Sequence, residues 1–267
     1  MDMLTTDISS LGYKAVKEKV DKIDVNEVHN SEDLIKIIDI LKADKRKNIN
    51  SLGNKLQRAK DKIESEIKRV REMYNFDKSF GDFQVVAGVD EVGRGPLAGP
   101  VVVAGVIMPK DSMIEGVNDS KKVSEKKREK LYDLIIEEAI SYSVAIIGQD
   151  VIDDINILNA TKSGVTQVVD GLDVKPDLIV VDALTGINTR GIPYEPIIKG
   201  DAKCYNIAAA SILAKVTRDR IMRQWDEIYP QYGFISHKGY GTAKHIAAIK
   251  EYGLCPIHRR TFTKKFV

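Results

Sequence analysis

Four acidic side chains stand at the ends of apolar runs, and their placement suggests metal-dependent chemistry. Asp90 and Glu91 close one run, and Asp182 closes another. Asp201 follows a third run, just before a long predicted helix. Catalytic groups of α/β sheets gather where strands end, and crowded carboxylates repel one another unless a cation neutralises them. Their hard oxygens suit Mg²⁺ or Mn²⁺, and two such ions can activate water and stabilise the leaving oxygen of a phosphodiester.

The alternative is that each acid is simply solvated, which is the commoner fate of an acid at a strand end. The metal-site interpretation therefore requires the strands and helices to bring all four acids together. The predicted strands all follow residue 80: Val85–Asp90, Val101–Met108, Tyr142–Ile147, Leu178–Asp182 and Ile192–Ile198. A glycine- and proline-rich turn joins the first two strands, which predicts a hairpin.

Predicted helices alternate with these strands. Ser124 is a good N-cap for a helix that runs to Ala139, and a further helical stretch ends at Val169. The last predicted segments are a helix over Ala202–Ile228, a glycine-rich loop over Gly233–Gly241 and a helix over Thr242–Tyr252. A hairpin followed by crossover strands predicts a mixed α/β sheet flanked by helices.

The first 80 residues differ in character, with many Lys and Glu residues at helical spacing. An apolar stripe with i, i+3, i+4, i+7 spacing follows the N-cap residue Ser31: Leu34, Ile37, Ile38 and Leu41. A second helical run extends from about Asn50 to Asn75. We expect a helical extension over residues 1–80 before a catalytic domain over residues 81–267. A solvated arm and a segment that adds nonspecific affinity for a nucleic acid duplex remain open alternatives.

Composition is that of an ordinary globular protein. The 267 residues are 43% hydrophobic and 30% charged, with a net charge of +2, so the overall charge does not indicate a nucleic-acid-binding protein. A basic cluster near the end is either a nucleic-acid contact or a solvated terminus: Arg259, Arg260, Lys264 and Lys265. The only cysteines, Cys204 and Cys255, have no metal-type spacing around them. Free thiols, no signal sequence and no membrane-spanning stretch lead us to expect a cytoplasmic protein.

The sequence around the acids resembles a known family. The stretch Val86–Pro100, VAGVDEVGRGPLAGP, resembles the signature of ribonuclease HII, the type 2 ribonuclease H. Further segments resemble blocks of that family in the same order: Asn118–Lys122, Val180–Asp182, Lys199–Asp201 with Ile207–Asp219, and His237–Thr242. One glycine motif would be weak evidence, whereas five blocks in order are specific.

This resemblance implies an RNase H-like mixed sheet flanked by helices, with extra C-terminal helices and the small helical N-terminal extension. The family's four catalytic and metal-binding acids match Asp90, Glu91, Asp182 and Asp201. The implied substrates are RNA–DNA hybrid duplexes and DNA with embedded ribonucleotides. Two-metal-ion catalysis with Mg²⁺ or Mn²⁺ would cut 5′ of the ribonucleotide and leave 5′-phosphate and 3′-hydroxyl ends. We expect a monomer without membrane association.

The resemblance also implies substrate contacts. Gly93, Arg94 and Gly95 match a tripeptide that meets the ribose at an RNA–DNA junction, together with a tyrosine that matches Tyr240. Glycine lets the backbone approach a sugar, and the 2′-hydroxyl is what distinguishes RNA. The alternatives are a tight turn and an ordinary loop tyrosine. Ser120 and Lys121 resemble the family's phosphate contacts.

Three further side chains share one predicted helix face, namely Ser211, Lys215 and Arg218. This face either meets the nucleic acid backbone or forms salt bridges in solvent. We interpret His237 and His258 as structural or adjacent to substrate, because metal-activated water needs no histidine base.

Two rival functions differ from this interpretation. A type 3 ribonuclease H would cleave RNA stretches but not a lone ribonucleotide; Arg94 and Asp201 favour type 2. A hybrid-binding protein without catalysis has no reason to carry all four acids. An enzyme with a nucleotide cofactor fits poorly, since its glycine loop needs a following helix.

Overall fold

The computed structural model describes residues 8–81 and 83–267. Contacts divide the chain into two compact units, residues 1–69 and residues 70–267. Among the helices described, none is long and apolar enough to cross a membrane.

The first unit is helical and has its own apolar core. It contains η1 (Ile8–Ser10), α1 (Tyr13–Asp21), α2 (Val25–Val28), α3 (Glu32–Ala43) and the first part of α4 (Lys47–Lys78). Ser31 begins α3 as the sequence predicted, and its hydroxyl accepts a hydrogen bond from the N–H of Leu34 at 3.1 Å. The predicted stripe of α3 is buried at the centre of this core.

Helix α4 contributes side chains to both units. Its early residues Leu52 and Leu56 pack in the first core. Its later residues Val70, Met73 and Tyr74 pack in the core of the second unit. The expected division at residue 80 follows the change in composition, whereas the division by packing lies earlier, within α4.

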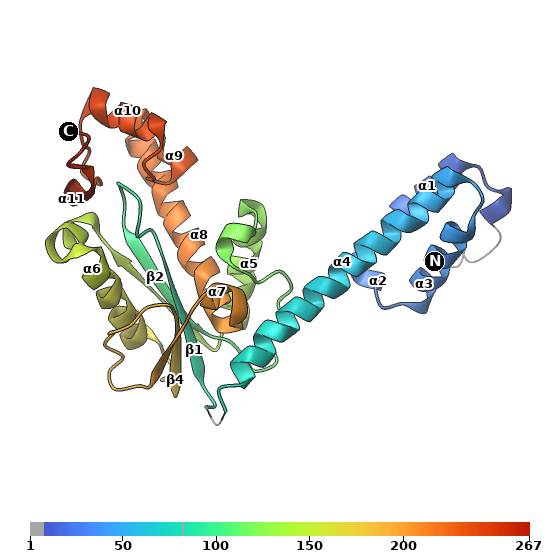
Figure 1. Ribbon diagram of the computed structural model, residues 1–267, viewed down its shortest axis with the longest axis horizontal. Coiled ribbons are helices and arrows are strands. Elements are labelled where there is room, and N and C mark those ends of the chain that lie inside the picture. Colours follow the sequence, from blue (N-terminus) through green and yellow to red (C-terminus); the bar gives the residue numbers. More distant parts are fainter. Residues whose placement is uncertain (1–7, 82) are drawn as a thin grey trace. The chain divides into compact units, whose positions relative to one another are not determined.

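A five-stranded mixed sheet forms the centre of the second unit (Figure 1). Its strands are β1 (Val86–Val92), β2 (Val101–Ile107), β3 (Ser141–Ile147), β4 (Leu178–Asp182) and β5 (Tyr194–Ile197). The strand order is β3-β2-β1-β4-β5. β1 and β2 form the predicted antiparallel hairpin, β3 is antiparallel to β2, and β4 and β5 extend the sheet in parallel from β1. The predicted mixed sheet is therefore confirmed.

Helices cover both faces of this sheet (Figure 1). They are α5 (Glu125–Glu138), α6 (Gln149–Gly171) and α8 (Tyr205–Ile228). The side chains of β2 alternate between the two faces of the sheet. Because helices cover both faces, every residue of β2 is buried. Val102 and Val106 pack in the core that α5 and α8 share. Val101 and Val103 pack on the opposite face, in the core formed with α6.

Helix α8 approaches β1 to backbone distance. A Cβ on Gly88 would lie 2.2 Å from the carbonyl carbon of Asn206 and 2.4 Å from the nitrogen of Ile207. The three fully buried alanines Ala208–Ala210 continue this close contact. Small side chains on both elements thus permit the approach that the alanine-rich segment predicted.

The single helix predicted over Ala202–Ile228 is wrong at its start. Cys204 has extended backbone, with φ −106° and ψ 127°, and it separates α7 (Gly200–Lys203) from α8. Asp201 therefore lies on a one-turn helix of its own, with an orientation independent of α8.

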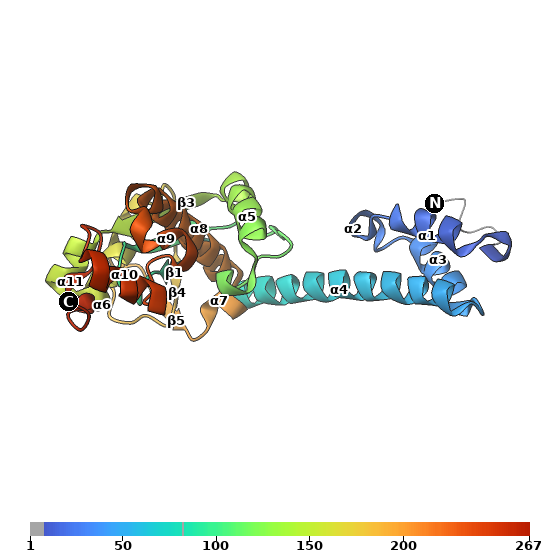
Figure 2. The same cartoon turned by 90° about the horizontal axis from the view of Figure 1, so that it is seen from above.

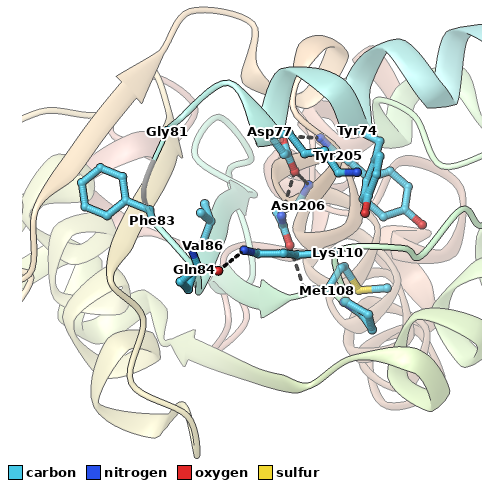
Figure 3. Close-up of a pocket in the computed structure, with 12 residues that line it drawn as sticks. Tyr74, Asp77, Gly81, Phe83, Gln84, Val86, Met108, Lys110, Tyr205 and Asn206 are labelled. Atoms are coloured by element: carbon cyan, nitrogen blue, oxygen red, sulfur yellow. Dashed lines mark hydrogen bonds between the residues drawn. The ribbon is translucent and has the colours of Figure 1, made fainter.

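Asp77, near the end of α4, caps the first turn of α8 (Figure 3). Its carboxylate accepts hydrogen bonds from the N–H of Tyr205 at 3.0 Å, the N–H of Asn206 at 2.9 Å and the Asn206 side chain at 2.7 Å. An acid at this position satisfies helix N–H groups and opposes the helix dipole. A cavity of about 240 Å³ lies beside the cap, and none of the four acids lines it.

The C-terminal segments gather where α8 ends (Figures 1 and 2). They are η3 (Pro230–Tyr232), α9 (Phe234–His237), α10 (Ala243–Tyr252) and α11 (Arg260–Thr263). The segment Gly233–Gly241, expected as a loop, includes the short helix α9. These are the extra C-terminal helices that the family resemblance implied.

Replacing Gly88 by alanine tests the contact between β1 and α8. The added methyl would overlap the backbone of α8, so we expect Gly88→Ala to lower the free energy of unfolding by about 3 kcal/mol in urea titrations. Gly12→Ala is the control, because nothing lies within 4 Å of its added methyl. The control should change the free energy by less than about 1 kcal/mol. Equal effects of the two substitutions would contradict the proposed contact.

Candidate active site

Two neighbouring strands place three of the predicted acids at one sheet edge. β1 and β4 run parallel with Val89 opposite Val181, so Asp90 and Asp182 are the next residues on their strands. Glu91 follows Asp90 on β1. Strand pairing alone therefore places the acidic residues at the C-terminal ends of β1 and β4 side by side.

The fourth acid reaches the same edge through β5. Ile197, at the end of β5, pairs with Asp182, and the chain then turns into α7, which carries Asp201. The N–H of Gly200 donates a hydrogen bond to Asp182 Oδ1 at 2.8 Å, which fixes α7 against the end of β4. Asp90 and Asp201 are 6% and 8% exposed, so two of the acids are buried.

Burial and mutual repulsion perturb these carboxyls. Burial raises the pKa of Asp90 well above its usual value, and the charges of Glu91, Asp182 and Asp201 raise it further. Burial also raises the pKa of Glu91, against the opposing effect of Arg94. The pKa of Asp201 is raised by burial and then by the charges of Asp119 and Asp182. Asp90 thus feels the charges of the other three acids, and Glu91 and Asp201 each feel the charge of Asp182, an arrangement that a bound cation would relieve.

Two basic side chains border the acids. Arg94 Nη1 lies 3.1 Å from Glu91 Oε1, and Lys121 Nζ lies 3.9 Å from Asp201 Oδ2. Within residues 8–81 and 83–267, no three His, Cys, Asp or Glu side chains are already arranged as ligands around one point. The carboxylates are therefore electrostatic neighbours whose present partners are protein donors.

The donor set nevertheless suits a hard divalent cation. Its members are carboxylate oxygens without nitrogen or sulfur, and this type of site prefers Mg²⁺ or Mn²⁺. Asp119 is an acid beside Asp201 that sequence reasoning did not single out. Its only signal was its position next to Ser120 within the segment Asn118–Lys122, the second of the five blocks.

The glycine tripeptide and Tyr240 are neighbours, as the family resemblance implied. A Cβ on Gly95 would lie 3.7 Å from Tyr240 Cε1, an ordinary contact distance. Gly93 has φ +93°, which an L side chain rarely adopts. Tyr240 is 45% exposed, so its ring is available at the surface beside the loop.

Arg259 holds the loop that contains this tripeptide. It is fully buried, and its guanidinium donates to the carbonyl oxygens of Gly93 at 2.6 Å, Arg94 at 3.0 Å and Gly99 at 2.9 Å. Burial lowers its pKa to about 9. Both interpretations of the basic tail are therefore wrong for Arg259, while Arg260 is exposed.

Arg218 performs a similar structural task from α8. It is fully buried and donates to the carbonyl oxygens of Pro100 at 2.9 Å, Ala98 at 3.1 Å and Lys238 at 2.8 Å. Burial lowers its pKa to about 10. Arg218 is thus a buried residue that binds backbone carbonyl groups. It neither meets a nucleic acid backbone nor forms a salt bridge in solvent, and nothing in the sequence predicted this.

The remaining expected contacts divide between surface and interior. Lys121 is exposed, whereas Ser120 is 3% exposed and its hydroxyl accepts a hydrogen bond from Ser211 at 2.9 Å. Lys215 forms an ion pair with Asp219 at 2.7 Å, but their side chains are only 16% and 4% exposed, so this helix face is not the solvent-exposed, salt-bridged face that one interpretation expected.

Comparisons with known proteins point to one family. A family model described as Ribonuclease HII matches residues 87–265, and one described as Ribonuclease HII N-terminal domain matches residues 14–81. The chain is 47% identical over 264 residues to ribonuclease HII of Ruminiclostridium cellulolyticum, covering 97% of this chain and 100% of that protein.

Solved structures agree with the family models. The fold is similar to that of the ribonuclease H2 from Pyrococcus horikoshii OT3, with a TM-score of 0.59 and 29% identity over 68% of this chain and 97% of that one. It is also similar to the structure of the PCNA:RNase HII complex from Archaeoglobus fulgidus, with a TM-score of 0.55 and 29% identity over 66% and 93% of the two chains.

The raised pKa of Asp90 leads to a stability prediction for the metal-free protein. Because its ionised form is disfavoured by folding, the charge costs stability at neutral pH, and the cost disappears as acidification protonates the carboxyl. Asp90→Asn removes the charge with little change in volume. We expect it to raise the free energy of unfolding by about 1–2 kcal/mol at neutral pH in the presence of a chelator. The gain should shrink as the pH falls.

Asp170→Asn is the matched control for this measurement. Asp170 pairs with Arg190 at 2.7 Å, and that hydrogen bond lowers its pKa, so the substitution should give no gain. A less stable Asp90→Asn variant would contradict the electrostatic account.

Proposed function

The chain belongs to the ribonuclease HII family, and on this premise we propose that it incises DNA duplexes 5′ of embedded ribonucleotides by two-metal-ion catalysis. The family membership makes the protein a metal-dependent endoribonuclease that acts on RNA in RNA–DNA hybrids. Proposed products carry 5′-phosphate and 3′-hydroxyl ends. The proposed cation is Mg²⁺ or Mn²⁺.

One observation carries this proposal: four acids from β1, β4 and α7 meet at one sheet edge, and they perturb one another. Burying like charges together is unfavourable unless a bound cation compensates. A protein that only bound hybrids would gain nothing from the arrangement.

The acids would hold the cations, which supply Lewis acidity and lower the pKa of bound water. Asp90 is central because the charges of Glu91, Asp182 and Asp201 all act on it. Asp90 would therefore hold a cation together with its acidic neighbours. Lys121, exposed beside Asp201, would attract the phosphate backbone and orient it toward the acids.

Ribose recognition is assigned to the tripeptide and Tyr240. Gly95 is the exposed glycine of this loop, and a Cβ there would meet only Tyr240 Cε1 at 3.7 Å, whereas the side of Gly93 is filled by Arg218. Arg259 and Arg218 hold the carbonyl groups around that backbone, so its position is set before substrate binds. A prearranged polar site discriminates strongly against a substrate that lacks the matching hydroxyl.

Asp90→Asn is the direct test of the catalytic assignment. The change removes a ligand charge and keeps the shape of the side chain, so we expect cleavage to fall by at least about a thousandfold while hybrid binding changes by less than about threefold. The assay compares the variant and the wild type on a labelled duplex with a single ribonucleotide, with Mg²⁺, with Mn²⁺ and with a chelator. Turnover at the wild-type rate in the variant would overturn the assignment. If the wild type cuts a hybrid with an all-RNA strand but not the duplex with a single ribonucleotide, a type 3 activity is favoured.

Tyr240→Ala tests ribose recognition. Junction selectivity is here the ratio of kcat/KM on a duplex with one ribonucleotide to kcat/KM on a hybrid with an all-RNA strand. We expect Tyr240→Ala to lower this ratio by about tenfold or more, while the Kd for duplex changes less. Tyr252→Ala, which alters another exposed tyrosine, serves as control. Equal losses on both substrates would argue against a recognition role.

A further inference from the structure

Buried histidines surround the backbone of Tyr240. His245 is fully buried and His258 is 3% exposed. His237 stacks on His245 with ring centroids 4.5 Å apart and planes inclined by 16°. None of these rings lies among the acids at the strand ends, so the catalytic assignment leaves them without a role.

The hydrogen bonds determine which ring nitrogens carry protons. The N–H of Cys255 donates to His258 Nδ1 at 2.9 Å, so that nitrogen accepts. His258 Nε2 must then carry the proton, and it donates to His245 Nε2 at 3.0 Å. His245 Nδ1 lies 3.0 Å from the carbonyl oxygen of Tyr240, which can only accept. The result is a directed chain, Cys255 to His258 to His245 to Tyr240, called here the histidine chain.

The two histidines of the histidine chain, His245 and His258, are neutral at neutral pH, and their hydrogen bonds assign one tautomer to each. Burial lowers the pKa of both His245 and His258 to about 4. His237 has a defined tautomer as well, since its Nδ1 accepts from the N–H of Gly239 at 3.2 Å and its Nε2 faces the carbonyl oxygen of Tyr232 at 2.9 Å. The hydrogen bond that His245 Nδ1 donates to Tyr240 therefore depends on which nitrogen of His258 carries its proton.

We propose that His245 and His258 are positioning residues that set the backbone of Tyr240 and thereby the ribose selectivity of the site. The proposal rests on the recognition role proposed for Tyr240. Its carbonyl oxygen accepts from His245 and also from the N–H of Thr242 at 2.8 Å, which fixes the peptide plane. The preceding residue, Gly239, accepts from the N–H of Leu97 at 2.8 Å. Rotation of this peptide would move the tyrosine ring relative to Gly95, where an added Cβ would lie 3.7 Å from Tyr240 Cε1.

The opposite tautomer of His245 would place a lone pair against the carbonyl oxygen of Tyr240. Two acceptors facing each other in a buried site repel, and the peptide would have to rotate or separate from the ring. His258 prevents this by donating to His245 Nε2, which makes that nitrogen the acceptor. Selectivity is thus linked to a residue that touches neither Tyr240 nor substrate.

Two variants of His245 separate positioning from simple structural support. In His245→Asn the amide nitrogen takes the place of Nδ1 and still donates to Tyr240, while the bond to His258 is lost. In His245→Gln the amide reaches the place of Nε2 and can accept from His258, while the donor to Tyr240 is lost. Both variants remove the ring and one hydrogen bond, so they should lose similar stability.

We expect His245→Gln to lower junction selectivity about tenfold, and His245→Asn to keep it within about threefold of the wild type. Melting curves establish that each variant is folded at the assay temperature. Equal selectivity in the two variants would overturn the proposal. If Tyr240→Ala itself leaves selectivity unchanged, the recognition role fails; if Tyr240→Ala lowers selectivity and His245→Gln does not, only the histidine chain fails.

The tautomers on which the proposal depends can also be measured in the unaltered full-length protein. Long-range ¹H–¹⁵N spectra of histidine rings distinguish an Nδ1–H from an Nε2–H tautomer. At neutral pH we expect Nδ1–H for His245 and Nε2–H for His258. His245→Gln should also shift the Tyr240 ring resonances, and His245→Asn should shift them less. An Nε2–H tautomer at His245 would overturn the proposal.

Discussion

Burying several carboxylates side by side opposes folding, and the catalytic unit is organised around that constraint. Asp90 lies on a central strand, paired on one side with β2 and on the other with β4, so it cannot move away from its neighbours. Arg94 and Lys121 provide partial compensation from the rim. The repulsion lowers the stability of the metal-free protein, and a cation bound at the proposed site would relieve it.

The constraint explains why α8 must lie so close to β1. The glycine at position 88 and the alanines of α8 allow backbone contact, which fixes the strand that carries Asp90 and Glu91. The extended residue Cys204 then lets α7 carry Asp201 in a direction that a continuous helix could not reach. Asp77 determines where α8 begins, so the last turns of α4 help to build the catalytic unit.

The C-terminal helices have a comparable task at the other side of the site. Arg259 and Arg218 bind carbonyl groups of the loop after β1, and His245 on α10 is hydrogen-bonded to the carbonyl oxygen of Tyr240. Polar groups buried in this way are costly unless every donor and acceptor is satisfied. Each nitrogen of the Arg218 and Arg259 guanidiniums has a carbonyl partner, so these contacts hold the loop after β1 in place.

Hydrophobic periodicity predicted the strands and most of the helices that alternate with them, because it is a property of short segments. The four acids were proposed from their positions at strand ends and from the family resemblance. The resemblance also indicated that Gly95 and Tyr240 belong to one site. The burial of Arg218 and Arg259 became visible only in the folded structure. The sequence around an arginine does not reveal whether its guanidinium will contact solvent or buried carbonyl groups. The break at Cys204 and the proton order of His245 and His258 likewise depend on partners distant in sequence, which no local pattern specifies.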